Sequence, residues 1–457
     1  MPELPEVETV KRILNTFLPG REIVRVEVRK KGIIIGDVDT FIATLIGRTF
    51  QIVERIGKYL IFTFDNDLIM LSHLRMEGRF VEVGQDEEDS RYAHVIFTFK
   101  DGRRLCYDDS RQFGKMELAT KETFRQTKSL LNVGPEPFDI NPKDYFNKLK
   151  SRQTPIKLSL LDQKLMSGLG NIYVDEVLYL SKIHPLHPSN KLSFPQVKLI
   201  INHSIAVLKA AIDQGGTTVR TYAPANGVHG NFQQQLYAYG QAGSHCRDCH
   251  FRIKKIFVGG RGTTFCPHCQ RNPGAAKTIA ITGLKASGKS VIANYLKRQG
   301  RLVFDSDTLA KDLYKDMQVV KTLANKLGVS LLKDGAFDLT LLRNHLLAHP
   351  EALKIVNAYI HPLVKEKIKS IIARHPGQTL YFEVPLVFSL KINELFDFII
   401  GVEVSLERQK ENLLRRGQTL GINPDAMYLK NRHRLDYILI NDGSIDDLIT
   451  KFKSLKF

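Results

Sequence analysis

The sequence predicts a multidomain protein in which a β-rich sandwich precedes a helical domain with a zinc β-hairpin and, last, an α/β P-loop domain with a parallel sheet. Three observations predict this fold class. The chain has 457 residues, more than a single compact core usually holds. The period of its apolar residues changes from alternating to helical, and then to short apolar runs between helical segments. Four of its five cysteines are concentrated in one short stretch.

The first part of the chain has the pattern of antiparallel strands. In REIVRVEVRKKGIIIG, RTFQIVERIGKYLIFTF and YAHVIFTFKDGRRLCYDDS, apolar and polar residues alternate, with Gly and Asp at the turns. The preceding EVETVKRILNTFLPG has a helical period and ends at Pro19-Gly20. We therefore expect a β-sandwich over 1–135, a helical domain over 136–240, a zinc finger over 241–272 and a P-loop domain over 278–457.

Charge is distributed unevenly along the chain. The net charge is +18. Residues 1–150 hold 24 basic and 24 acidic side chains, whereas 151–276 hold 14 against 5 and 277–457 hold 28 against 19. The middle stretch therefore favours nucleic-acid binding, although basic residues that merely solvate a surface are the alternative. No apolar run approaches the ~20 residues that span a bilayer, and no targeting segment is evident, so we expect a cytoplasmic protein without a membrane partner.

The cysteine-rich stretch SHCRDCHFRIKKIFVGGRGTTFCPHCQ has two CxxC pairs. Two such knuckles can hold one zinc ion tetrahedrally, and four thiolates leave no open position, so the site is structural. The ligands would be Cys246, Cys249, Cys266 and Cys269. Only basic charges lie between the knuckles, which suits contacts with phosphate.

The start, MPELPEVETV, suggests an unusual nucleophile. Removal of Met1 would expose Pro2 as a secondary amine, and an α-amino group titrates near pH 8. Such an amine can attack a sugar C1′, displace the base and form an iminium, while the adjacent Glu3 moves protons. Alternatively, Pro-Glu is only a helix N-terminus.

Several motifs in order decide between these readings. They are HLRMEG (73–78), DDSRQFGKM (108–116), NVGPEPF (132–138), LLDQKLMSGLGNIYVDEVL (160–178), GGTT (215–218) and the cysteine hairpin. Together with the N-terminus, they make residues 1–271 resemble formamidopyrimidine-DNA glycosylase, a bifunctional base-excision enzyme that removes 8-oxoguanine and ring-opened purines from double-stranded DNA. The resemblance implies that the helical domain contains a helix–two-turn–helix over 158–180.

The resemblance also implies roles for individual residues. Pro2 would be the Schiff-base nucleophile and Glu3 the proton donor for base loss, while Lys58 would assist β-elimination and Arg261 would contact the phosphate and aid δ-elimination. A wedge of Met76, Arg111 and Phe113 would fill the gap left by the extruded base. Contacts with the DNA backbone are implied for His94, Arg152, Lys157 and Asn171, and the segment 215–227 would close over the flipped base.

The last part of the chain begins with a strand, a G-x-x-x-x-G-K-S loop and a helix, TIAITGLKASGKSVIANYLKRQG. In this context the pattern predicts a P-loop that binds ATP or GTP. Lys289 would reach the outer phosphates, and the Ser290 hydroxyl would hold Mg²⁺. Backbone N–H groups from Gly283 to Ser290 would bind the phosphates, and the residues between them that contribute are Lys285, Ala286, Ser287 and Gly288.

The segments FDSD (304–307), AYIHPLV (358–364), YFEVPLVF (381–388), RQKENLLRRG (408–417) and DYILINDGS (436–444) follow in order. With the P-loop, they resemble dephospho-CoA kinase over about 278–455, which phosphorylates the ribose 3′-hydroxyl of dephospho-CoA with ATP. The resemblance implies Asp305 as the base, Asp307 and His361 at the acceptor, and Arg415 or Arg416 as the lid cation. Asn441 would lie near the nucleotide base.

The P-loop departs from that family, which usually has two glycines and another small residue where this chain has Leu284 and Lys285. Glu383 stands where Asp is usual, and Ser389 where an acid is usual.

From the two resemblances, we expect a monomeric fusion of a glycosylase/AP lyase with a P-loop kinase. The alternative is a zinc-containing DNA-binding repair protein whose second half is a generic nucleotide kinase or an inactive scaffold.

Overall fold

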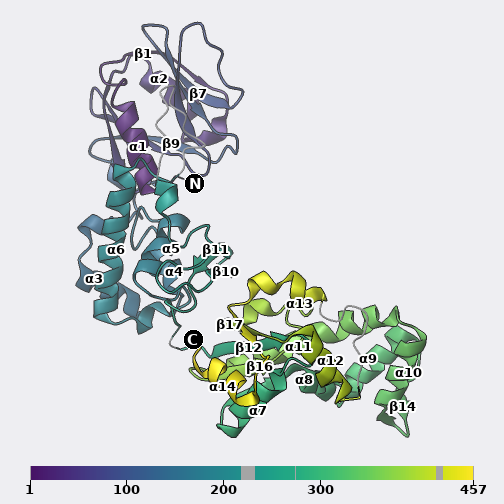
Figure 1. Cartoon of the computed structure of the whole chain (residues 1–457). Coiled ribbons are helices and arrows are strands. Elements are labelled where there is room, and N and C mark those ends of the chain that lie inside the picture. Colours follow the sequence, from purple (N-terminus) through teal and green to yellow (C-terminus); the bar gives the residue numbers. More distant parts are fainter. Residues whose placement is uncertain (1, 218–231, 273, 418–425, 456–457) are drawn as a thin grey trace. The chain divides into compact units, whose positions relative to one another are not determined.

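The computed structural model describes residues 2–217, 232–272, 274–417 and 426–455, shown in Figure 1. The chain divides into two compact units, Met1–Arg271 and Asn272–Phe457. Each unit has its own hydrophobic core.

The N-terminal unit begins with helix α1 (Leu4–Leu14) beside a sandwich of two sheets. The alternation in the sequence becomes strands whose apolar sides face each other, and a cluster of phenylalanines that includes Phe50, Phe62 and Phe97 fills the space between them. One sheet has the order β1 (Ile23–Val28), β7 (Ala93–Phe99), β8 (Arg104–Asp108), β6 (Arg79–Val83). The other has the order β2 (Ile34–Ile35), β9 (Lys115–Thr120), β5 (Leu68–His73), β4 (Tyr59–Phe64), β3 (Phe50–Ile56), and α2 (Val38–Leu45) follows β2 in the chain.

A helical region follows, as the change in period predicts. Its helices are α3 (Pro142–Lys150), α4 (Ile156–Leu161), α5 (Asn171–Leu180) and α6 (Phe194–Asp213). The hairpin of β10 (Lys254–Val258) and β11 (Arg261–Phe265) turns through Gly259 and Gly260, both in the left-handed region with φ of 56° and 74°. Two consecutive positive φ angles make the tight turn that matches the strand twist, and glycine adopts them without strain.

The C-terminal unit is a parallel sheet with helices, as predicted. The strand order is β13 (Leu302–Asp305), β16 (Thr379–Glu383), β12 (Lys277–Gly283), β17 (Phe398–Glu403), β18 (Tyr437–Ile440). Since the carboxyl ends of parallel strands share one edge, the ends of β12, β13 and β16 bring Gly283, Asp305 and Glu383 to the same crevice. The helices are α7 (Lys289–Arg298), α8 (Ser306–Leu313), α9 (Met317–Leu327), α10 (Leu339–Ala348), α11 (Ala352–Arg374), α12 (Leu406–Leu414), α13 (Ala426–Lys430) and α14 (Ile445–Lys453), and a small hairpin joins β14 (Leu332–Lys333) to β15 (Ala336–Phe337).

Within the described ranges, we find no helix with both the length and the apolar character needed to cross a bilayer.

Candidate functional sites

The Glu3 carboxylate lies at the N-terminus of α5, far away in sequence. It accepts hydrogen bonds from the backbone N–H groups of Gly170 (2.7 Å), Ile172 (2.9 Å) and Tyr173 (3.4 Å). The residue is only 2% exposed. Burial raises the pKa of Glu3 to about 7, although Lys58 and the N–H donors act in the opposite direction. A carboxyl group that titrates near neutrality, directly after the half-buried Pro2, is suited to proton transfer.

Lys58 is buried on the same side of the unit. Its Nζ donates to the Leu169 carbonyl at 2.8 Å, and burial lowers the pKa of this amine. The turn before it is fixed by Arg55, whose guanidinium makes two hydrogen bonds to the Glu136 carboxylate (2.5 and 3.0 Å) and one to the Gly57 carbonyl (3.0 Å). Glu136 also accepts the Gly57 N–H at 2.7 Å. This ion pair, which the sequence did not reveal, holds Lys58 in place.

Glu6 is a second residue that sequence reasoning missed. Its carboxylate accepts from the backbone N–H of Glu3 (2.9 Å), from the Tyr173 hydroxyl (2.6 Å) and from the Thr217 N–H (2.9 Å). Its position three residues after Glu3 matches the spacing of a capping box, which is a signal that could have identified it. Glu6 therefore connects the N-terminus to α5 and to the residue before the segment 218–231. Most of the predicted base-covering segment 215–227 lies outside the described residues.

The three predicted wedge residues are exposed on two neighbouring turns. Met76 is 38% and Phe113 51% exposed, and the Arg111 guanidinium lies 5.1 Å from the centroid of the Phe113 ring. Arg75 and Gln112, which precede Met76 and Phe113, have positive φ angles of 55° and 57°. Such strained conformations in residues other than glycine often occur at functional sites.

Buried residues support these turns from below. The Asp109 carboxylate accepts the backbone N–H groups of Arg111, Phe113 and Gly114 at 2.8–3.0 Å. The Tyr107 hydroxyl occupies the space where a Cβ would lie on Gly78 or Gly114, at 2.1 and 1.7 Å. No side chain larger than hydrogen fits at either glycine without moving the tyrosine.

Four residues were predicted to contact the DNA backbone, and two of them are buried in this structure. Lys157 is completely buried, and its Nζ pairs with Asp175 at 2.6 Å, so it connects α4 to α5. His94 is also buried, and its Nε2 donates to the Asp109 carbonyl at 2.9 Å, so it supports the wedge turn. Sequence spacing gives no measure of depth, so the burial of both side chains was not predictable, and their contact with DNA stays a prediction.

The other two predicted backbone contacts lie nearer the surface. Arg152 is partly exposed and pairs with Asp162 at 2.9 Å. Asn171 opens α5, and its amide donates to the Gly262 carbonyl of the hairpin at 3.0 Å. Arg261, which directly follows the two-glycine turn, is exposed. A helix N-terminus and an exposed guanidinium lie on either side of this contact, and both suit phosphate.

The four predicted zinc ligands gather at one point. The Sγ atoms of Cys246, Cys249, Cys266 and Cys269 all lie within 4.8 Å of one another. Four thiolates at ~2.3 Å from one tetrahedral zinc would lie ~3.8 Å apart, which is within this limit, so the residues present fit the ion. The Tyr179 hydroxyl lies 3.0 Å from the Cys246 sulfur, a position from which it can donate to the thiolate.

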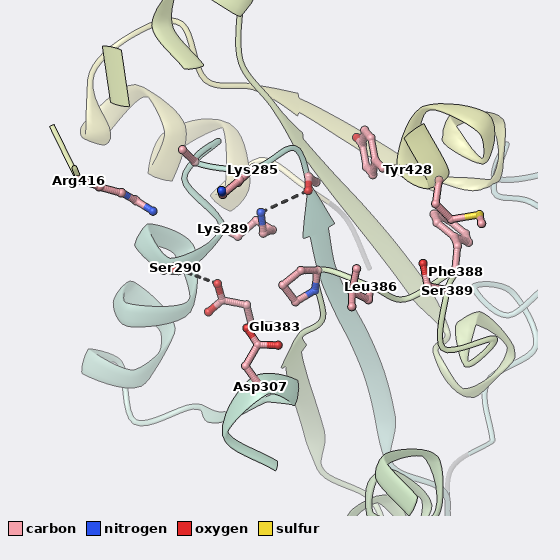
Figure 2. A pocket seen from close by; sticks show the side chains of 14 residues that line it. Lys285, Lys289, Ser290, Asp307, Glu383, Leu386, Phe388, Ser389, Arg416 and Tyr428 are labelled. Atoms are coloured by element: carbon pink, nitrogen blue, oxygen red, sulfur yellow. Dashed lines mark hydrogen bonds between the residues drawn. The ribbon is translucent and has the colours of Figure 1, made fainter. Parts of the chain in front are cut away.

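In the C-terminal unit, a cavity of about 430 Å³ opens beside the P-loop (Figure 2). Lys289 at the start of α7 extends back along the loop and donates to the carbonyls of Gly283 (3.2 Å) and Leu284 (2.7 Å). The Ser290 hydroxyl donates to Glu383 at 2.6 Å. Of the predicted nucleotide-binding residues, Ser287 and Gly288 are buried in the same loop, and those that line the cavity are Gly283, Lys285, Ala286, Lys289, Ser290 and Arg416.

The predicted acceptor-side residues separate into two groups. Asp307 lines the cavity, and burial, followed by the neighbouring Asp305, raises its pKa. Asp305 instead caps α8, accepting from the N–H groups of Asp307 and Thr308. His361 on α11 is half-buried, and burial lowers its pKa. Neither His361 nor the exposed Arg415 is among the described residues that line the cavity.

Comparisons with known proteins were made for both units. Family models match residues 1–116 (formamidopyrimidine-DNA glycosylase N-terminal domain), 133–223 (formamidopyrimidine-DNA glycosylase H2TH domain) and 277–447 (dephospho-CoA kinase). The formamidopyrimidine-DNA glycosylase of Lactobacillus gasseri is 46% identical over 275 residues, which cover 59% of this chain and 99% of that protein. The enzyme of the same name from Ligilactobacillus salivarius is 44% identical over 272 residues, with the same shares covered.

Solved structures agree with these relatives. A complex of Lactococcus lactis Fpg with DNA that contains an abasic site is 40% identical and superimposes with a TM-score of 0.57, covering 59% of this chain and 100% of that one. A mutant of the same protein, bound to DNA that contains Fapy-dG, has the same identity, coverage and score. The similarity to these structures therefore extends over the length of the N-terminal unit.

Proposed function

The chain belongs to the formamidopyrimidine-DNA glycosylase family and continues into a dephospho-CoA kinase domain, and we propose how each half of this bifunctional fusion works. For the first half, the substrate is double-stranded DNA with 8-oxoguanine or a formamidopyrimidine, and the reaction is base excision followed by β,δ-elimination. The observation that carries the proposal is Glu3, whose buried carboxyl group, with a pKa of about 7, lies directly beside Pro2.

The reaction follows from these groups. With Met1 removed, the Pro2 nitrogen bonds to C1′ of the damaged nucleotide as the bond from C1′ to the base breaks. Glu3 gives its proton to the departing base. The C1′–O4′ bond then breaks as O4′ takes up a proton, which opens the sugar ring and leaves an iminium between C1′ and the Pro2 nitrogen. The iminium withdraws electrons, so the C2′ proton is lost and the 3′-phosphate leaves by β-elimination. Lys58, an amine with a lowered pKa, assists this proton transfer, and Arg261 holds the phosphate and aids the second elimination, which releases the 5′-phosphate.

Before this chemistry, the damaged base must leave the helix. We propose that Met76 and Phe113 enter the stack and that Arg111 pairs with the orphaned base on the opposite strand. Arg152 and Asn171 hold the DNA backbone. One structural Zn²⁺ is held by the four cysteines, which fixes the hairpin that carries Arg261. We also propose that the protein acts as a cytoplasmic monomer.

The test of the first half is borohydride trapping on a duplex that contains 8-oxoguanine. The wild-type protein should form a covalent adduct, and mass spectrometry should find Pro2 at the mature N-terminus. The matched control is a Pro2→Glu variant, in which Met1 is retained and no adduct forms. A wild-type protein that retained Met1 and still cleaved the DNA would exclude the proline mechanism.

For the second half, we propose transfer of the ATP γ-phosphoryl group to the ribose 3′-hydroxyl of dephospho-CoA. Lys289 binds the outer phosphates, and Ser290 and Glu383 would hold Mg²⁺, which when bound neutralises phosphate charge. Asp307 lines the cavity with a raised pKa, so we assign it the role of base in place of Asp305. Arg416 lines the cavity, so we assign it, ahead of Arg415, the role of lid cation, and we retain His361 and Asn441 as proposed acceptor and nucleotide contacts.

The kinase test compares acceptors and the two aspartates. ATP turnover should depend on dephospho-CoA; equal turnover with plain nucleosides would indicate a generic kinase, and no turnover would indicate a scaffold. Asp307→Asn should lower kcat by about 10²-fold or more, as expected for loss of a general base. Asp305→Asn, the matched control, should change kcat by about threefold or less and leave the stability of the unit nearly unchanged, because asparagine caps α8 about as well as aspartate. The opposite result would return the base role to Asp305.

A further inference from the structure

Lys285 is one of the residues at which the C-terminal unit departs from the family that it resembles. It stands in the P-loop where that family usually has a small residue, and it is exposed. It lines the same cavity as Lys289 and Arg416, whereas Asp307 and Glu383 contribute the carboxylates. Figure 2 shows Lys285 and Lys289 extending from the loop side of this cavity. Three cations around one cavity indicate a polyanionic ligand.

The backbone that carries Lys285 is held from outside the cavity. The Gln409 side-chain amide donates to the Lys285 carbonyl at 2.8 Å, and the Asn412 amide donates to the Ala286 carbonyl at 3.1 Å. Asn441 does the same for the Ser287 carbonyl at 2.8 Å. Three successive carbonyls are thus bound by side chains of α12 and of the segment after β18. The fold therefore fixes the position from which the Lys285 side chain starts.

The order of these contacts along the loop indicates which phosphate Lys285 meets. Ser287, near the far end, is bound by Asn441, which is not among the described residues that line the cavity. Lys285, two residues earlier, borders the cavity together with Asp307 and Glu383. The carboxylates mark the side where the metal and the acceptor would lie, and the phosphate nearest the acceptor is the one transferred.

We propose that Lys285 contacts the γ-phosphate of ATP as a second P-loop lysine, in addition to Lys289. The proposal rests on ATP being the phosphoryl donor of this unit. On transfer, the bond between the γ-phosphorus and the β,γ-bridging oxygen breaks, and the acceptor oxygen bonds to the phosphorus. Asp307 takes the acceptor proton, and ADP leaves. Lys285 forms no covalent bond and binds charge that is present in ATP and absent from ADP.

The experiment is calorimetric titration of the full chain with Mg-ATP and with Mg-ADP. Lys285→Met should weaken Mg-ATP binding by about tenfold or more, as expected for one charge-assisted contact, and change Mg-ADP binding less than twofold. Lys285→Arg should keep most of the preference for ATP. Lys297→Met, the same substitution at an exposed lysine of α7, is the matched control and should alter neither affinity.

Other outcomes overturn the inference in recognisable ways. Equal losses for ATP and ADP in Lys285→Met would place the lysine on the inner phosphates. An unchanged ATP affinity with a raised KM for dephospho-CoA would place it on the acceptor. If the wild-type protein binds both nucleotides but transfers no phosphate, the proposed function fails, and the comparison of ATP with ADP still tests Lys285.

Discussion

In the N-terminal unit the Glu3 carboxylate receives three backbone N–H groups and is almost wholly buried, whereas in the C-terminal unit Glu383 receives one serine hydroxyl at the edge of an open cavity. At the first site, burial and the protein's own charges set the pKa values of Glu3 and Lys58 without any ligand. At the second site, Lys285, Lys289 and Arg416 line one cavity, and the negative charge that balances them would come from the bound ligand. Identical side-chain chemistry can therefore depend on the fold in one site and on the ligand in the other.

The largest expected effect is at Glu3. Glu3→Gln should lower the single-turnover rate of base excision by about 10²–10⁴-fold, because the proton donor is lost. Since the pKa of Glu3 is about 7, its protonated form is depleted above that pH, and the wild-type rate should fall about tenfold per pH unit above about pH 8, where the Pro2 amine is already neutral and no longer offsets this loss. The residual activity of the variant should lack this limb. A limb that persists in Glu3→Gln would assign the titration to another group.

A pair of arginines compares burial between the units. Arg55 and Arg432 each make two hydrogen bonds to a glutamate, but the Arg55 side chain is 10% exposed and that of Arg432 is 50% exposed. Arg55→Met should lower the free energy of unfolding of its unit by about 3–5 kcal/mol, because the carboxylates of Glu136 and Glu8, which are 14% and 10% exposed, both lose their bonds to the guanidinium. Arg432→Met should leave thermal unfolding nearly unchanged, because Arg432 is half exposed and solvent already weakens this pair, and Glu403 keeps the hydrogen bond from the Tyr428 hydroxyl at 2.9 Å.

The measurement is thermal unfolding of the full chain, in which Mg-ATP identifies the transition of the C-terminal unit. Adding Glu136→Gln to Arg55→Met should recover part of the lost stability, since the buried charge is then removed. If Arg55→Met and Arg432→Met had equal effects, burial would not be what distinguishes the two pairs.

The smallest expected effect comes from shortening a carboxylate in the open site. Glu383→Asp should change kcat by about threefold or less, because the cavity can admit water or metal where one methylene is lost. The same change at Glu3 should be severe, since the side chain fills the space beside Gly170, where a Cβ would lie 2.2 Å from the Glu3 carboxyl carbon. Steady-state rates of the two reactions measure both. A large loss of kcat in Glu383→Asp would show that the reaction depends on the exact position of this carboxylate, although the cavity around it is open.

The sequence was sufficient where function is encoded by local spacing. The two CxxC pairs, the P-loop and the alternation of the first strands predicted the cysteine cluster, the cavity beside Lys289 and the sandwich. Contacts between distant segments were not predictable, because no local signal joins Arg55 to Glu136 or Gln409 to the Lys285 carbonyl. For the same reason, the burial of Lys157 and His94 could not be predicted from the sequence. Asp305 and Asp307 have the same chemistry in sequence, and only the cap of α8 distinguishes them.

The single phenol of Tyr107 has an evolutionary consequence. Its hydroxyl lies where a Cβ would lie on Gly78 or on Gly114. The sequences of the two turns that carry Met76 and Phe113 could therefore not diverge independently during evolution. Replacing either glycine by a larger residue would require a smaller residue at Tyr107. That smaller residue would leave a cavity beneath the other turn. The three positions should therefore change together or remain fixed.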